Sequence, residues 1–193
     1  YSYFDLDTDN CIPISESIIN NLYIIGENHG PVLQILEGED NVEVCGITLI
    51  EGDANYGGGI LISNASPLIE SVRIHDNQSE YDGGGIYAEN FNGRLNNITI
   101  DENKSSRNGA GLYLFNSQPK IENIVVENNS YQLGNYDLDG GGLYLNHSTP
   151  EIFENVIILN NVASNDGGGI YLNNSDIYHA ENIEIYSNNS NRN

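Results

Sequence analysis

The chain has 193 residues, 38% of them hydrophobic, and a formal net charge of −22 from 28 acidic against 6 basic side chains. Such a charge repels a phosphate backbone and an anionic lipid surface, so the sequence predicts neither nucleic-acid binding nor docking to such a membrane. No apolar run approaches the roughly 20 residues that span a bilayer. We therefore expect a partner that is neutral, cationic or a metal ion.

The N-terminal residues predict an edge of the fold. Residues 1–20 lack the basic and apolar regions of a secretory signal, and the chain starts without Met, so we expect it to be processed, excised or incomplete. Residues 1–15 are expected to form a cap or lead-in strand before a repeating part at 16–193. The two cysteines, Cys11 and Cys45, predict either a disulfide that fixes this edge or two buried thiols.

A repeat of about 26 residues organises the rest of the chain. Each unit carries a mark in which two glycines flank a small residue and an aliphatic residue follows. The marks begin at Gly57, Gly83, Gly109, Gly140 and Gly167, at steps of 26, 26, 31 and 27 residues. Two earlier apolar runs, around Ile24 and Leu49, have the same spacing but lack the mark. We therefore expect about seven coils.

Each unit holds three short runs of alternating apolar and polar residues, separated by Gly, Asn, Ser, Asp or Pro. The runs have the period of β-strands and no helical period. Strands this short must pair with the next unit, so the sequence predicts an all-β fold, a parallel β-solenoid with three short strands per coil. A β-propeller or sandwich is the alternative, although a propeller blade needs about 40 residues.

One repeat is longer than the others, and its excess falls at residues 130–139. We expect this insertion to loop outward from the solenoid. Insertions in solenoids gather on one face, which is often the binding face, but a neutral insertion fits the sequence equally well.

Stacking in register places equivalent residues above one another, so alternation assigns each column a direction. Core columns are expected at the aliphatic residue of each mark, while the third glycine is expected to point outward. The next outward column contains four tyrosines and is flanked by one carboxylate, Glu89. The tyrosines are Tyr87, Tyr113, Tyr144 and Tyr171. They predict either a glycan-binding platform, with Glu89 beside it, or a structural column that reinforces strand pairing.

Two polar columns lie at the turns. One consists of asparagines that we expect to hydrogen-bond from coil to coil: Asn77, Asn103, Asn129, Asn161 and Asn188. In the other, Asp82, Asp139 and Asp166 precede the glycine marks in register. These carboxylates predict either a candidate calcium site or a solvated acidic face that prevents lateral aggregation. No other cofactor is expected.

The sequence offers little for catalysis. None of the six basic residues falls on the tyrosine strand, Glu89 is a lone carboxylate, and the four histidines occupy different columns. A lyase needs a base and a clamp for the substrate, and a glycosidase needs two carboxylates. We therefore expect no catalytic residue and no enzyme, with a polysaccharide lyase or hydrolase as the alternative.

The glycine marks recur together with an aliphatic-x-x-Asn motif, as in Ile74-x-x-Asn77 and Ile100-x-x-Asn103. This pair of motifs resembles the repeats of bacterial right-handed parallel β-helix surface proteins, in particular polymorphic outer membrane proteins, and the wider pectin-lyase-like fold. Ile or Val stands here where those repeats have Phe. The resemblance implies a right-handed β-helix, an extracellular or cell-surface location, and a structural or adhesive role.

The sequence stops at Asn193, just after the third strand of the last expected coil. An open coil exposes backbone donors and acceptors that can pair with further strands. We therefore expect either a longer chain that continues the solenoid or self-association through coil ends, which would build a head-to-tail filament.

Overall fold

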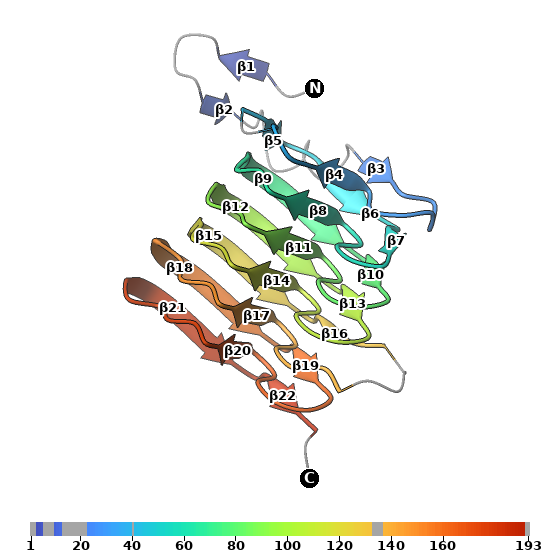
Figure 1. Ribbon diagram of the computed structural model, residues 1–193, viewed down its shortest axis with the longest axis vertical. Helices are drawn as coiled ribbons and strands as arrows, with labels where there is room; N and C mark the ends of the chain where they lie inside the picture. The colour runs from blue at the N-terminus through green and yellow to red at the C-terminus, as the bar shows by residue number, and fades with distance from the viewer. Residues whose placement is uncertain (1–2, 6–9, 13–22, 40, 133–136, 192–193) are drawn as a thin grey trace.

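The computed structural model describes residues 3–5, 10–12, 23–39, 41–132 and 137–191. In these residues the strands stack as successive rungs from the N-terminal to the C-terminal end of the molecule (Figure 1). The described part contains no helix, and hence no helix that could cross a membrane. The expected all-β parallel solenoid is confirmed.

Three parallel sheets form the sides of the solenoid, and each coil contributes one strand to each sheet. The long-strand sheet contains β3 (Tyr23–Ile25), β6 (Thr48–Ile50), β9 (Leu68–His75), β12 (Arg94–Asp101), β15 (Lys120–Glu127), β18 (Ile152–Leu159) and β21 (Ala180–Tyr186), with β5 (Glu43–Cys45) also pairing with β9. The tyrosine sheet contains β4 (Leu33–Ile35), β8 (Ile60–Ser63), β11 (Ile86–Glu89), β14 (Leu112–Phe115), β17 (Leu143–Asn146) and β20 (Ile170–Asn173). The short-strand sheet contains β7 (Asp53–Ala54), β10 (Gln78–Ser79), β13 (Lys104–Ser105), β16 (Ser130–Tyr131), β19 (Val162–Ala163) and β22 (Asn189–Ser190).

The described residues make about six turns, since the tyrosine sheet and the short-strand sheet have six strands each. About seven coils were expected. The difference lies at the N-terminal end, where most of the first expected coil falls outside the described residues and only β3 represents it. Before it, β1 (Tyr3–Asp5) and β2 (Asn10–Ile12) pair antiparallel with each other.

The core fills the space between the three sheets. The aliphatic residues of the marks face inward, and Ile60, Ile86 and Leu112 are fully buried. The prediction that the third glycine points outward is wrong. A Cβ on Gly59 would lie 2.5 Å from Cγ2 of the core residue Ile74. The reason is that the chain turns at Gly57, with φ of +61°, so strand alternation starts only after the mark.

Left-handed backbone positions turn the chain at the corners of each coil. In the coil that starts at Gly57, the other corners are Asn64, Ser71 and Asp76, with φ between 50° and 54°. Asn recurs at most of these corners in later coils because it tolerates this conformation better than most residues with a side chain. The abundance of asparagine is therefore largely a consequence of the coil geometry.

The expected coil-to-coil asparagine column is confirmed as a buried ladder. Oδ1 of Asn103 accepts from the backbone N–H and from Nδ2 of Asn77, each at 3.0 Å. Its own Nδ2 donates to the Ile74 carbonyl and to Oδ1 of Asn129. Both ends of each amide are thus satisfied inside the protein, where an unpaired polar group would be costly.

The insertion at 130–139 begins with β16 and returns to the solenoid at Leu138. Leu138 is fully buried and packs with Ala110 and Ala163, with Tyr131 against them. Residues 133–136 lie outside the described part of the chain. The described ends of the insertion are therefore anchored in a small second core.

Candidate functional site

The four tyrosines of the predicted column stack face to face along the solenoid. Ring centroids are 5.3 Å apart between Tyr87 and Tyr113, and 5.1 Å apart between each of the next two pairs. The rings are within 17° of parallel. Tyr56 continues the column on the N-terminal side, with its ring centroid 5.0 Å from that of Tyr87.

Contact between the rings leaves little of the two middle tyrosines exposed. Tyr113 and Tyr144 are each only 7% exposed, although both point away from the core. Each ring covers a face of the next, so a pyranose has no free face on these two residues on which to stack. Glu89 is half-buried at the end of β11 and pairs in register with Ser63 and Phe115. The geometry fits a structural column better than a glycan platform.

Burial also changes the acidity of these phenols. Loss of solvent raises the pKa of Tyr113 to about 12, although Nδ2 of Asn146 donates to its hydroxyl oxygen at 2.9 Å and partly opposes the shift. The pKa of Tyr87 is raised further, by burial and by the nearby Glu89 charge. Burial likewise raises the pKa of Tyr144. The phenols are therefore poor proton donors at neutral pH.

The candidate calcium residues lie in one corner column, where they hold the backbone of the next coil. Oδ1 of Asp82 accepts from the Asn108 N–H, Oδ1 of Asn108 accepts from the Asp139 N–H, and Oδ1 of Asp139 accepts from the Asp166 N–H, at 2.9 to 3.3 Å. Asn108 performs the same task as the aspartates. Burial raises the pKa of Asp82, which Arg107 and Asn108 partly oppose. The column has a structural use without a metal ion, and calcium binding there stays a prediction.

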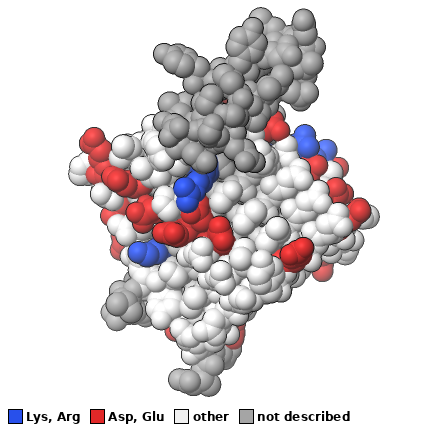
Figure 2. All heavy atoms as spheres, turned by 180° about the vertical axis from the view of Figure 1, so that it is seen from behind, with Lys and Arg blue, Asp and Glu red and all other residues white. Residues whose placement is uncertain are grey.

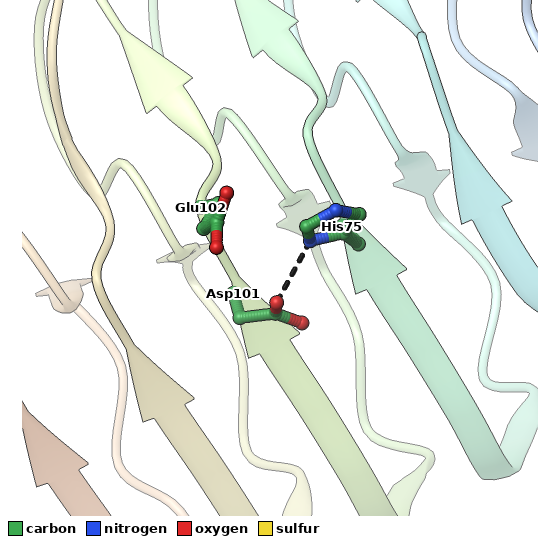
Figure 3. A group of neighbouring side chains, drawn as sticks. All are labelled: His75, Asp101 and Glu102. Carbon is green, nitrogen blue, oxygen red and sulfur yellow. Dashed lines mark hydrogen bonds and ion pairs between the residues drawn. The ribbon is translucent and has the colours of Figure 1, made fainter. Parts of the chain in front are cut away.

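A second group of side chains was missed in the sequence analysis. Among the described residues, His75, Asp101 and Glu102 form the group of metal-ligating side chains whose ligand atoms all lie within 4.8 Å of one another (Figure 3). His75 ends β9 and Asp101 ends β12, and the two are paired in register. Asp101 lies one repeat length after His75 in the sequence, so the repeat spacing could have predicted that these two side chains are neighbours.

Asp101 is the centre of this group. Its side chain is 5% exposed, and Oδ2 lies 2.7 Å from Nδ1 of His75. Arg73, two residues before His75, donates from Nε to Oδ1 at 2.9 Å and from Nη2 to Oδ2 at 2.6 Å. The Arg73 guanidinium therefore neutralises the buried carboxylate and occupies the position beside His75 that a metal ion would need. These hydrogen bonds raise the pKa of Arg73.

Charge is unevenly distributed on the surface. Figure 2 shows a large cluster of acidic side chains along one edge of the rear face and a smaller group along the opposite edge, with a few basic side chains near both, while much of the face between them is uncharged. On the long-strand sheet, Glu122 and Glu154 pair in register, and so do Glu154 and Glu181. Arg94 partly offsets this row, since Nε lies 2.7 Å from Oε2 of Glu122.

A pocket of about 540 Å³ opens near the N-terminal end of the tyrosine column. Its polar lining includes His29, Asp53 and Glu80, and its apolar lining includes Tyr56 and Leu61. Oδ2 of Asp53 accepts from Nε2 of Gln78 at 2.8 Å. The residues before Gly57 lack the glycine mark, so the regular column pattern could not predict this pocket.

Cys45 in β5 is disulfide-bonded. The side chain of Cys11 lies outside the described residues, so its pairing with Cys45 stays a prediction. The bond would link the lead-in strands to the first coils.

Comparisons with known proteins agree with this geometry. The family model for the right-handed beta helix region matches residues 13–190. No curated protein and no solved structure matches the chain significantly. The matched range covers the stacked sheets, the tyrosine column and the asparagine ladder. The chain therefore belongs to the right-handed beta-helix family.

Proposed function

We propose that this chain is a non-enzymatic structural or adhesive module that acts outside the cell or at its surface. The observation that carries the proposal is the stack of Tyr113 on Tyr144. The tyrosine column is the outward feature that most resembles a ligand platform. Stacking leaves Tyr113 and Tyr144 only 7% exposed each, so a ligand has no free ring face there. Such a column stiffens the solenoid along its axis.

The carboxylates support the same proposal. Asp82 and Asp139 each hold the backbone of the following coil, and Asp101 is held by Arg73. A catalytic acid or base must instead reach a substrate atom and exchange a proton with it. These buried or half-buried groups are engaged in holding neighbouring coils together, so they are poorly placed for acid–base chemistry.

We extend the proposal to the coil ends, which would be covered either by a second copy of this chain or by a longer chain that continues the solenoid. In the last described coil, Leu172 is 45% and Ile185 is 51% exposed, whereas their equivalents one coil earlier, Leu145 and Ile158, are fully buried. A second coil with the same apolar columns would cover these side chains and pair with the β20 and β21 backbones. Sedimentation over a range of concentrations tests this, with Ile185→Glu as the variant. Association that is absent, or unchanged in the variant, would rule out the second copy and favour a longer chain that continues the solenoid.

A second candidate function is glycan binding or cleavage in the pocket beside Tyr56. The specific observation is that this pocket combines an aromatic ring, amides and two carboxylates, Asp53 and Glu80. An array of neutral and uronate glycans tests it, with Tyr56→Ala as the variant. Binding that disappears in the variant would favour an adhesive role, and new reducing ends or unsaturated products would favour an enzyme.

A further inference from the structure

The turn between β11 and β12 contains the pair Asn92-Gly93, of which Asn92 is exposed and Gly93 is half-buried. We propose that Asn92 is a site of spontaneous deamidation, at which this turn converts to aspartate and isoaspartate while the rest of the fold stays intact. The proposal rests on how the fold treats the two Asn-Gly pairs of the chain, Asn92-Gly93 and Asn108-Gly109.

The reaction needs only water. The Gly93 backbone nitrogen attacks Cγ of Asn92, the Cγ–Nδ2 bond breaks, and Nδ2 leaves as ammonia with the proton from Gly93. The product is a five-membered succinimide. One water molecule then opens it at either of its two carbonyl carbons, giving aspartate or isoaspartate.

The nucleophile and the target are both accessible in the folded protein. Asn92 is exposed, and Gly93 has no side chain to shield its nitrogen. Among the described residues, the Gly93 N–H donates no hydrogen bond. No backbone hydrogen bond of the Gly93 nitrogen therefore has to break before this nitrogen can approach Cγ.

A hydrogen bond from the next coil also favours the reaction. The Gln118 N–H makes a bifurcated hydrogen bond, to Oδ1 of Asn92 at 2.9 Å and to the Phe91 carbonyl oxygen. Negative charge develops on Oδ1 when Cγ is attacked. A backbone N–H already directed at that oxygen stabilises the tetrahedral intermediate.

Hydrogen bonds protect the other pair, Asn108-Gly109, from the same reaction. The Gly109 N–H donates to the Asp139 carbonyl at 3.0 Å, so its nitrogen is fixed in the ladder. Nδ2 of Asn108 donates to Oδ1 of Asp82 at 3.0 Å, so the amide nitrogen that must leave is also engaged. Because these hydrogen bonds must break before the nitrogen can attack, we expect the reaction at Asn108 to be slower by about tenfold or more.

The conversion would change both charge and packing. The product carries one more negative charge, because an aspartate side chain is ionised at neutral pH. Isoaspartate also adds an atom to the backbone of a tightly packed turn. A Cβ on Gly93 would lie 2.2 Å from the Pro67 carbonyl oxygen, and the Gly93 carbonyl accepts from the Lys120 N–H at 3.0 Å. We expect isoaspartate to loosen this turn.

The test is prolonged incubation of the folded chain at mildly alkaline pH, followed by peptide mass spectrometry and enzymatic methyl labelling of isoaspartate. We expect conversion at Asn92 to be at least about tenfold faster than at Asn108. A parallel incubation in concentrated urea should make the two sites convert at similar rates. Equal rates in the folded chain, or faster conversion at Asn108, would overturn the proposal.

A variant at Asn92 tests whether the chemical change occurs at this residue, in a chain that should still fold. Asn92→Ser places at this position the residue that occupies it one repeat earlier, Ser66. The variant should fold, lose the acidic shift of the aged protein, and retain slow conversion at Asn108. If the aged variant still gains isoaspartate in the peptide that spans this turn, the assignment to Asn92 is wrong. Gly93→Ala is unsuitable because its Cβ would collide with Pro67.

Discussion

Tyr113 and Tyr144 lie face to face on neighbouring coils, with ring centroids 5.1 Å apart and ring planes within 15° of parallel. Each hydroxyl accepts from an asparagine one coil further along, Asn146 for Tyr113 and Asn173 for Tyr144. The column is therefore joined both through its rings and at its polar ends. This relationship makes the tyrosine column a part of the scaffold.

Removing a ring from the middle of the column should destabilise the solenoid. Tyr113→Ala deletes a ring that contacts two others, and we expect the free energy of unfolding to fall by about 3 kcal/mol. Tyr113→Phe keeps the ring and loses only the hydroxyl, so it should cost about 1 kcal/mol or less. Denaturant unfolding measures both variants. Similar losses in the two would show that the stacking contributes little.

The raised phenol pKa values predict loss of stability at alkaline pH. A tyrosine has a pKa of about 10 in an unfolded chain, and that of Tyr113 is about 12 in the folded protein. The unfolded state therefore loses its proton first, so the contribution of Tyr113 is complete below pH 10 and is lost as the pH rises to about 12. Tyr87 and Tyr144 shift in the same direction. Unfolding midpoints between pH 9 and 12, an interval chosen to bracket these values, test this. In Tyr113→Phe the decline should be smaller, and an identical profile would contradict the account.

The corner column of Asp82, Asn108, Asp139 and Asp166 should require a side-chain oxygen that accepts a hydrogen bond, but no negative charge. Asp139→Asn keeps the acceptor for the Asp166 N–H, as Asn108 does naturally, and should change the free energy of unfolding by less than about 1 kcal/mol. Asp139→Ala removes that acceptor and should cost about 1 to 2 kcal/mol. Melting temperatures in calcium and in chelator complete the test. A calcium-dependent increase in the parent chain that Asp139→Asn abolishes would establish the calcium site instead.

The buried carboxylate of Asp101 should depend on Arg73. Arg73→Thr, which introduces the residue found one coil later at Thr99, removes both donated hydrogen bonds and should cost about 2 kcal/mol. The matched control is Arg94→Ala, since the Arg94–Glu122 pair is more exposed and should contribute less than about 1 kcal/mol.

The same variant tests whether Arg73 takes the place of a metal ion. With the guanidinium removed, His75, Asp101 and Glu102 are free to ligate, so zinc should raise the melting temperature of Arg73→Thr and leave the parent chain unchanged. Stabilisation of the parent chain by zinc, lost in His75→Asn, would show that the cluster binds metal with Arg73 in place.

The repeat made most of the fold predictable. Because equivalent residues recur about 26 positions apart, the sequence places Tyr87 above Tyr113 and Asn77 above Asn103, and the structure confirms both columns. Alternation assigned Tyr113 to the outer surface but could not predict its burial, since burial depends on neighbouring rings. It also failed at Gly59, because the left-handed turn at Gly57 interrupts the strand pattern.

The contacts around Asp101 were only partly predictable, because His75 and Asp101 share one column whereas Arg73 lies in another. Arg73, His75 and Asp101 come from two columns and two coils, and their contacts depend on the lengths of the side chains. The pocket beside Tyr56 forms where the regular repeat is absent. Such sites require coordinates, whereas ladders can be predicted from spacing.

We propose that the side chains of this solenoid hold coils together and catalyse no reaction. The most direct measurement is incubation of the purified chain with neutral and uronate polysaccharides, beside Asp53→Asn and Glu80→Gln, while new reducing ends and unsaturated products are recorded. The account predicts no product above the background of the two variants. Product that forms with the parent chain and disappears in either variant would contradict it, and would identify the pocket beside Tyr56 as an active site.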